Sequence, residues 1–60
     1  MHPAPIETVK SMRTDHKSVR IERVNGSQPY RVVIVWHGRT QPAVYCRTLE
    51  AAEAVMARHA

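Results

Sequence analysis

The chain has 60 residues, one cysteine and a formal net charge of +4, from nine lysines and arginines against five aspartates and glutamates. A chain this short forms at most one domain, has little room for a substrate pocket, and cannot make an internal disulfide from Cys46. No apolar run approaches the ~20 residues that a membrane-spanning helix needs. Because a lone thiol suits a reducing compartment, we expect a cytoplasmic protein that stays outside membranes.

Residues 1–16 carry four basic or histidine side chains and two prolines near the start, which favour an extended or disordered lead. Ile6, Val9 and Met12 recur every three residues, as in a short helix over residues 6–13. A helix of that length needs packing to persist. The segment is predicted to be a basic N-terminal arm, flexible or short-helical, and the alternative is a lid on the sheet.

Three segments have patterns typical of β-strands. Residues 17–24 alternate between apolar and polar, residues 30–37 are the longest run of β-branched and aromatic residues, and residues 43–47 form a shorter run. Asn25-Gly26 is a strong hairpin signal, and the stretch 38–42 predicts a second turn. A strand with two apolar faces, such as 30–37, belongs in the middle of a sheet.

A helix is predicted to follow over residues 49–59. Thr48 is its expected N-cap, and Glu50 falls in its first turn, where a carboxylate is favourable. Its apolar stripe contains Leu49, Ala52, Val55 and Met56. The predicted fold class is therefore α+β, a three-stranded antiparallel meander with one C-terminal helix on one face, over residues 17–60.

Opposed residues of an antiparallel pair point to the same face of the sheet. With loops at 25–28 and 38–42, the predicted opposed pairs are Ile21 with Val32, Val19 with Ile34, Trp36 with Val44, and Ile34 with Cys46. The face under the helix, which is the predicted core, then contains Val19, Ile21, Tyr30, Val32, Ile34, Trp36, Val44 and Cys46. The other face contains Ser18, Arg20, Glu22, Arg31, Val33, Val35, His37, Tyr45 and Arg47.

This second face carries the strongest functional signal. Arginines from three strands could converge on phosphates or guanine edges, and the aromatic side chains could stack on bases. The predicted nucleic-acid-binding residues are Arg20, Arg31, His37, Tyr45, Arg47, Arg39 and Lys17. The leading hypothesis is a small basic nucleic-acid-binding protein, with DNA favoured over RNA, although basic charge also serves solubility alone.

The apolar pair Val33 and Val35 favours a different function. Adjacent exposed valines on a central strand suggest a buried interface. The alternative hypothesis is therefore a protein-interaction module, either a regulator or inhibitor that docks on a larger protein or a sheet-mediated homodimer. A cover from the N-terminal segment would explain the same valines without any partner.

The sequence argues against a metal site and against catalysis. It has no Cys-x-x-Cys or His-x-x-x-His pair, and His37 and Cys46 are predicted on opposite faces. It lacks a glycine-rich phosphate loop, and its one closely spaced pair of carboxylates, Glu50 and Glu53, is predicted on the solvent side of the helix. We therefore expect no cofactor, no metal and no enzyme activity, and we expect Cys46 to serve as a small core side chain.

Residues 45–54, Tyr-Cys-Arg-Thr-Leu-Glu-Ala-Ala-Glu-Ala, run from a strand into a capped helix. Together with the predicted order of strands and helix, they resemble in architecture the small arm-type DNA-binding domains at the N-termini of tyrosine-recombinase integrases. Those domains use a three-stranded sheet on DNA. The resemblance implies DNA binding by the sheet and transfers no residue roles to this chain.

Overall fold

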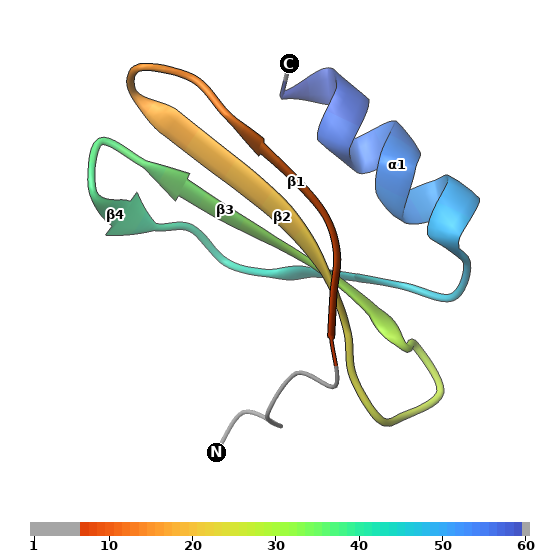
Figure 1. The fold of residues 1–60 in the computed structure, drawn as a ribbon. Helices are drawn as coiled ribbons and strands as arrows, with labels where there is room; N and C mark the ends of the chain where they lie inside the picture. Colours follow the sequence, from red (N-terminus) through yellow and green to blue (C-terminus); the bar gives the residue numbers. More distant parts are fainter. Residues whose placement is uncertain (1–6, 60) are drawn as a thin grey trace.

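A computed structural model describes residues 7–59 of the chain. These residues form one antiparallel sheet with helix α1 across one face (Figure 1). The elements are β1 (Glu7–Arg13), β2 (Lys17–Arg23), β3 (Tyr30–Trp36), β4 (Arg39–Thr40), β5 (Val44–Cys46) and α1 (Leu49–Arg58). The antiparallel sheet and the C-terminal helix are confirmed, but the prediction of three strands was wrong, because the sheet has five.

Strand β3 lies in the middle of the sheet, where the sequence predicted its longest β-branched run. It pairs with β2 along one side and with both β4 and β5 along the other. Strand β1 pairs with β2 and forms an outer edge. The central position gives β3 backbone partners on both sides, which is what a strand with two apolar faces requires.

Residues 7–13 form strand β1 rather than a short helix or a lid. Met12 is half-buried, lies opposite Val19 and packs against the core, whereas the rest of β1 is exposed. A strand with one partly buried residue shows no clear alternation, so its sequence does not reveal it. The register shifts at Val9, as in a β-bulge. Residues 1–6 of the predicted arm lie outside the described residues.

The register of the first predicted hairpin is confirmed, because Ile21 lies opposite Val32 in the β2–β3 pair. The predicted register of β5 was wrong. Val44 lies opposite Val32 instead of Trp36, and Cys46 lies opposite Tyr30. The shift covers an even number of residues, so each side chain of β5 still points to its predicted face.

The turn after β3 causes this shift. His37 and Gly38 have positive φ angles of 51° and 78° and form a tight hairpin that sets Trp36 opposite Arg39. Positive φ at both central residues is typical of a type I′ turn. The chain returns beside β3 as β4 and then passes through residues 41–43 before β5 pairs further along β3.

The core lies between the sheet and α1. Its buried members are Val19, Ile21, Val32, Ile34, Cys46, Ala52 and Met56. Val19, Ile21 and Val32 have no exposed surface, and burying an aliphatic side chain of this size contributes about 1.5–3 kcal/mol. Cys46 is a free thiol that packs in this core, as predicted.

Helix α1 begins at the predicted cap. Thr48 Oγ1 accepts a hydrogen bond of 3.1 Å from the backbone N–H of Ala51, which satisfies one of the open donors of the first turn. Glu50 lies in the first turn and Arg58 in the last, so both charges complement the helix dipole. Among residues 7–59, no helix is long and apolar enough to cross a membrane.

Two residues predicted for the core are exposed, Trp36 by 51% and Val44 by 38%. The ten residues of α1 span about 15 Å, whereas the seven residues of β3 span about 23 Å. The helix is therefore too short to cover the whole sheet face. Trp36 ends β3 beside the C-terminal end of α1 and keeps half of its surface open.

Candidate nucleic-acid interface

The structure divides the predicted site residues between two regions. Those on the open face, which we define as the sheet face away from α1, are Arg20, Arg31 and Tyr45. The second region is the end of the molecule that we call the hairpin end. It comprises the turn at residues 14–16, the turn at His37 and Gly38, the strand residues next to these turns, and the C-terminal end of α1. The predicted site residues at the hairpin end are Lys17, His37 and Arg39. Arg47 follows β5 and is exposed.

On the open face, Arg31 is engaged in a buried ion pair. Its Nη2 lies 2.7 Å from Oε1 of Glu22, and both side chains are less than a tenth exposed. Arg20 Nε donates to the other oxygen of Glu22 at 2.6 Å, but the Arg20 side chain remains 44% exposed. Two of the three arginines predicted on this face are thus held by one carboxylate, and one of these two, Arg31, is buried.

The pKa values of this cluster follow from its contacts. Burial by itself would raise the pKa of Glu22, but hydrogen bonds from Arg20 and Arg31 outweigh it and hold that pKa below its usual range. Hydrogen bonds with Tyr45 and then with Glu22 raise the pKa of Arg31 above its ordinary value. Glu22 and Arg31 therefore form an ionised pair at neutral pH.

The valines of the open face are less accessible than the sequence suggested. Val33 is buried, with 8% of its surface exposed, and Val35 is half-buried. Val33 lies opposite Arg20 and borders a hollow of about 420 Å³ that residues 40–43 also line. Val33 is thus buried within the monomer, and residues 40–43 lie beside it.

At the hairpin end, two turns that are distant in sequence lie side by side. The backbone N–H of His37 donates to the carbonyl of His16 at 2.8 Å, and their imidazole rings stack with centroids 5.0 Å apart. The first turn is closed by Thr14, whose backbone N–H donates to the carbonyl of Lys17 at 2.7 Å. Backbone bonds therefore hold the two turns, and with them the two histidines, next to each other.

A row of three side chains crosses the sheet on the α1 side of this end. Trp36 of β3 lies opposite Lys17 of β2 and opposite Arg39 of β4. Neighbouring strands are about 4.8 Å apart, so the side chains of Lys17 and Arg39 leave the sheet on either side of the exposed indole. Lys17 Nζ lies 5.9 Å from the indole centroid and 3.3 Å from the carbonyl oxygen of His59, a geometry typical of a weak cation–π contact.

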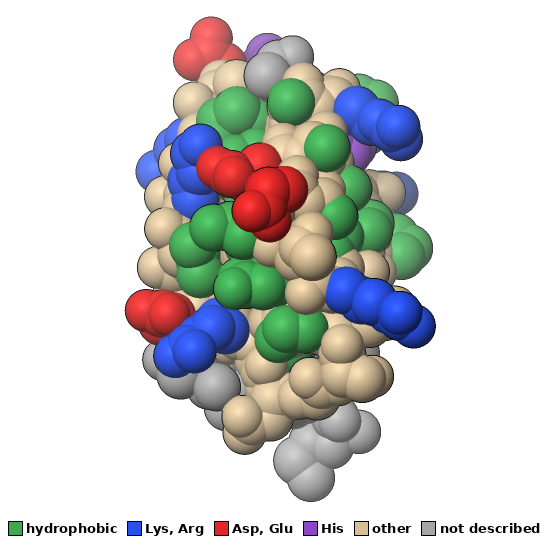
Figure 2. All heavy atoms as spheres, turned by 90° about the vertical axis from the view of Figure 1, so that its right-hand side faces the viewer, with side chains coloured by type: hydrophobic (Ala, Val, Ile, Leu, Met, Phe, Trp, Pro, Cys, Tyr) green, Lys and Arg blue, Asp and Glu red, His purple; other side chains and the backbone are tan. Residues whose placement is uncertain are grey.

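Unpaired positive charge also gathers at this end. Within residues 7–59, the arginines without a carboxylate partner are Arg13, Arg39, Arg47 and Arg58. All but Arg47 belong to the hairpin end, and Asp15 is a carboxylate in the same region. On the α1 side, hydrophobic and acidic side chains occupy the middle, and lysine and arginine side chains lie along the margins (Figure 2). The surface best suited to phosphates is thus an end of the molecule, not one of its broad faces.

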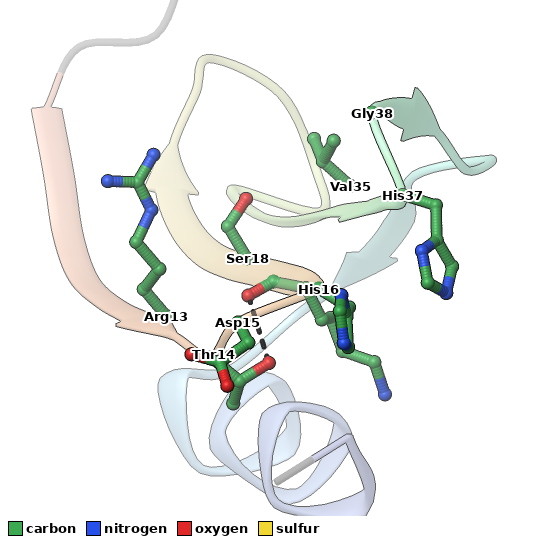
Figure 3. A pocket seen from close by; sticks show the side chains of 9 residues that line it. Arg13, Thr14, Asp15, His16, Ser18, Val35, His37 and Gly38 are labelled. Atoms are coloured by element: carbon green, nitrogen blue, oxygen red, sulfur yellow. Dashed lines mark hydrogen bonds between the residues drawn. The ribbon is translucent and has the colours of Figure 1, made fainter.

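Two hollows open at the hairpin end. One of about 400 Å³ lies over the first turn, with Arg13, Ser18 and Val35 pointing to the open-face side and His16 and His37 beside them (Figure 3). The other, of about 300 Å³, lies on the α1 side and is lined by Lys17, Ile34, Trp36, Gln41 and His59. Both are shallow and open, which suits a polymer that lies across them better than an enclosed small molecule.

Sequence reasoning missed Trp36 and His16 as candidate site residues. Alternation assigned Trp36 to the core, because parity gives the face of a side chain but not whether the helix reaches it. The signal that was present is its position as the last residue before a turn. His16 becomes a candidate only because its ring stacks on that of His37, 21 positions away in the sequence. No local sequence pattern could have predicted this contact.

The described residues show no cluster of metal-ligating side chains. Among them, no group of three or more histidine, cysteine, aspartate or glutamate side chains could hold a metal ion. Comparison of the chain with family models, with curated proteins and with solved structures found no match. Its function must therefore be argued from the surface that the fold builds.

Proposed function

We propose that this protein binds nucleic acid, and that the hairpin end is its main contact surface. The observation that carries the proposal is the row in which exposed Trp36 lies between Lys17 and Arg39. Cations next to an exposed aromatic ring are the combination that nucleic-acid-binding surfaces use, since cations neutralise phosphates while the ring stacks on a base. His16 and His37 extend the ring surface across the end of the sheet.

The open face has a secondary role in this proposal. Arg31 is held by Glu22 and fixes the sheet, so it is not among the expected contacts. Arg20 and Arg47 are exposed enough to add phosphate contacts at the margin. Arg13 links the two surfaces, because it lies at the end of β1 and points to the open-face side (Figure 3).

The protein-interaction hypothesis, with a larger protein or a second copy as partner, loses part of its support. It depended on exposure of Val33 and Val35, but Val33 is buried within the monomer. Exposed aromatic residues and arginines are also enriched at protein interfaces. The hairpin end would serve such a partner as well, so the alternative is kept as the competing outcome of the experiment below.

The test is a titration of labelled single-stranded and duplex oligonucleotides at several salt concentrations, followed by fluorescence anisotropy. Binding should weaken steeply with salt, by about 0.7 to 0.9 log units per log unit of salt for each neutralised phosphate. Arg39→Gln and Arg13→Gln should each reduce that slope by about one phosphate.

The matched control is Arg23→Gln, because Arg23 is similarly exposed but pairs with Glu7 at 3.0 Å, away from the hairpin end. It should leave the salt slope unchanged. A smaller salt slope for Arg47→Gln with an unchanged salt slope for Arg39→Gln would show that the contact surface is the open face instead. Absence of binding to any oligonucleotide at low salt would overturn the proposal, and self-association in sedimentation would then favour the alternative.

A further inference from the structure

We infer that the hollow beside Trp36 receives an unpaired nucleobase, so that the protein prefers single-stranded nucleic acid to duplex. This inference rests on the proposed function and adds the substrate class. It depends on one juxtaposition, in which an exposed indole, a hollow and two cations share the α1 side of the hairpin end.

The lining of the hollow suits a flat, partly polar ring. Trp36 and Ile34 supply apolar surface, and Gln41 has an amide that can both donate and accept hydrogen bonds. Its volume of about 300 Å³ leaves room for a base. The backbone N–H of Gln41 donates to the carbonyl of Ile34 at 2.8 Å, so Gln41 is held beside β3.

The indole of Trp36 is positioned to stack on a base and not to pack in the core. Half of its surface is open, although burying a tryptophan would stabilise a domain this small. Two neighbouring groups contact the ring: Lys17 Nζ lies 5.9 Å from its centroid, and the tilted His37 ring lies 5.3 Å from it. The ring is thus oriented before any ligand arrives, which lowers the entropy lost on binding.

A duplex cannot use this hollow as it stands. Its bases stack on one another, and extruding one costs a few kcal/mol, whereas the bases of a single strand are free to stack on a protein ring. Lys17 and Arg39 flank the indole across neighbouring strands, so the phosphates on either side of a stacked base would meet one cation each. The arrangement therefore fits a single-stranded nucleic acid that runs across β2, β3 and β4.

Trp36 is the one tryptophan of the chain, so its fluorescence reports directly on the hollow. Short oligothymidylate, short oligouridylate and a duplex of matched length are titrated at the same low salt concentration. Both single strands should quench Trp36 emission and bind at least about tenfold more tightly than the duplex, and the two single strands separate DNA from RNA. Trp36→Ala should weaken single-strand binding by about 5- to 100-fold, and Trp36→Phe should retain most of the affinity.

Val44→Ala is the control, because Val44 is an exposed apolar residue that lies opposite Val32, away from the hairpin end and outside the lining of the hollow. It should leave the single-strand preference intact. Unchanged Trp36 emission at saturation, equal affinity for duplex, or equal affinity of Trp36→Ala and the parent would each overturn this inference and leave the proposed function standing. Absence of binding to every oligonucleotide would overturn both. Unfolding of each variant in urea confirms that it is folded.

Discussion

Arg31 donates two hydrogen bonds to one oxygen of Glu22, from Nη2 at 2.7 Å and from Nε at 3.1 Å. The two residues lie directly opposite each other on β3 and β2. Both side chains are buried on the face of the sheet that α1 does not cover. The ion pair therefore joins β2 and β3, two neighbouring strands of seven residues, on the face that α1 leaves open. Its removal should destabilise the whole sheet.

Glu22→Gln should lower the free energy of unfolding by about 2–3 kcal/mol, because Arg31 would keep its charge in a buried position with no counter-charge. This is somewhat less than the roughly 3–5 kcal/mol typical of broken buried pairs, because the amide oxygen of glutamine can still accept a hydrogen bond from Arg31. Urea denaturation followed by circular dichroism measures it. The control Glu53→Gln removes an exposed pair with Lys10 and should cost at most about 1 kcal/mol. Equal losses in the two variants would contradict the structural role of the buried pair.

The parity of the sheet was predictable, and the Glu22–Arg31 pair shows where prediction stopped. Alternation in β2 and β3 and the Asn25-Gly26 turn fix which residues oppose each other, so the core face followed. The same parity placed both charges on the other face. Whether they pair depends on rotamers and on the cover from residues 40–43, which are set by tertiary packing.

The candidate site was less predictable than the fold. Lys17, Trp36 and Arg39 form a row because the second turn is only two residues long. A histidine at the first turn position, instead of asparagine or glycine, hides a type I′ hairpin from sequence rules. A longer loop would have placed Trp36 opposite Val44, which is the predicted arrangement, and Arg39 would have been part of a loop.

The stability contributed by Glu22 should depend on pH in a defined direction. Its pKa in the folded state is lowered below the unfolded value of about 4.3, so the unfolded chain takes up the proton first as pH falls. The contribution is complete above the unfolded pKa and is lost as pH falls through the folded pKa. The stability difference between parent and Glu22→Gln should therefore be largest near neutral pH and shrink below about pH 4.

Urea denaturation of the two proteins at neutral and at acidic pH measures this difference. Arg31 stays charged throughout, because its pKa is raised above an already high value. Glu53→Gln, compared with the parent in the same way, controls for the general loss of a carboxylate. A difference between parent and Glu22→Gln that stays constant down to about pH 2 would show that the pair does not lower the pKa of Glu22.

Thr48→Ala should lower the free energy of unfolding by about 1 kcal/mol, because the N–H of Ala51 loses its acceptor at the start of α1. Thr48→Ser keeps the hydroxyl oxygen and should stay close to the parent. The measurement is urea denaturation with the helical signal in circular dichroism as the probe. If both variants lose the same stability, the methyl group of Thr48 and not its hydrogen bond is responsible.

Gly38→Ala tests the turn that builds the Trp36 row. A Cβ at Gly38 would meet no atom within 4 Å, so any effect must come from the backbone, whose φ is +78°. Left-handed geometry costs an L-residue about 1–2 kcal/mol, partly offset by a less flexible unfolded chain, and we expect a net loss of about 1 kcal/mol in urea denaturation. His37→Asn should instead preserve or slightly raise stability, because asparagine accepts positive φ and Asn-Gly is the preferred type I′ pair. Unchanged stability in Gly38→Ala would mean that the turn relaxes to another geometry, and the position of Arg39 beside Trp36 would then change with it.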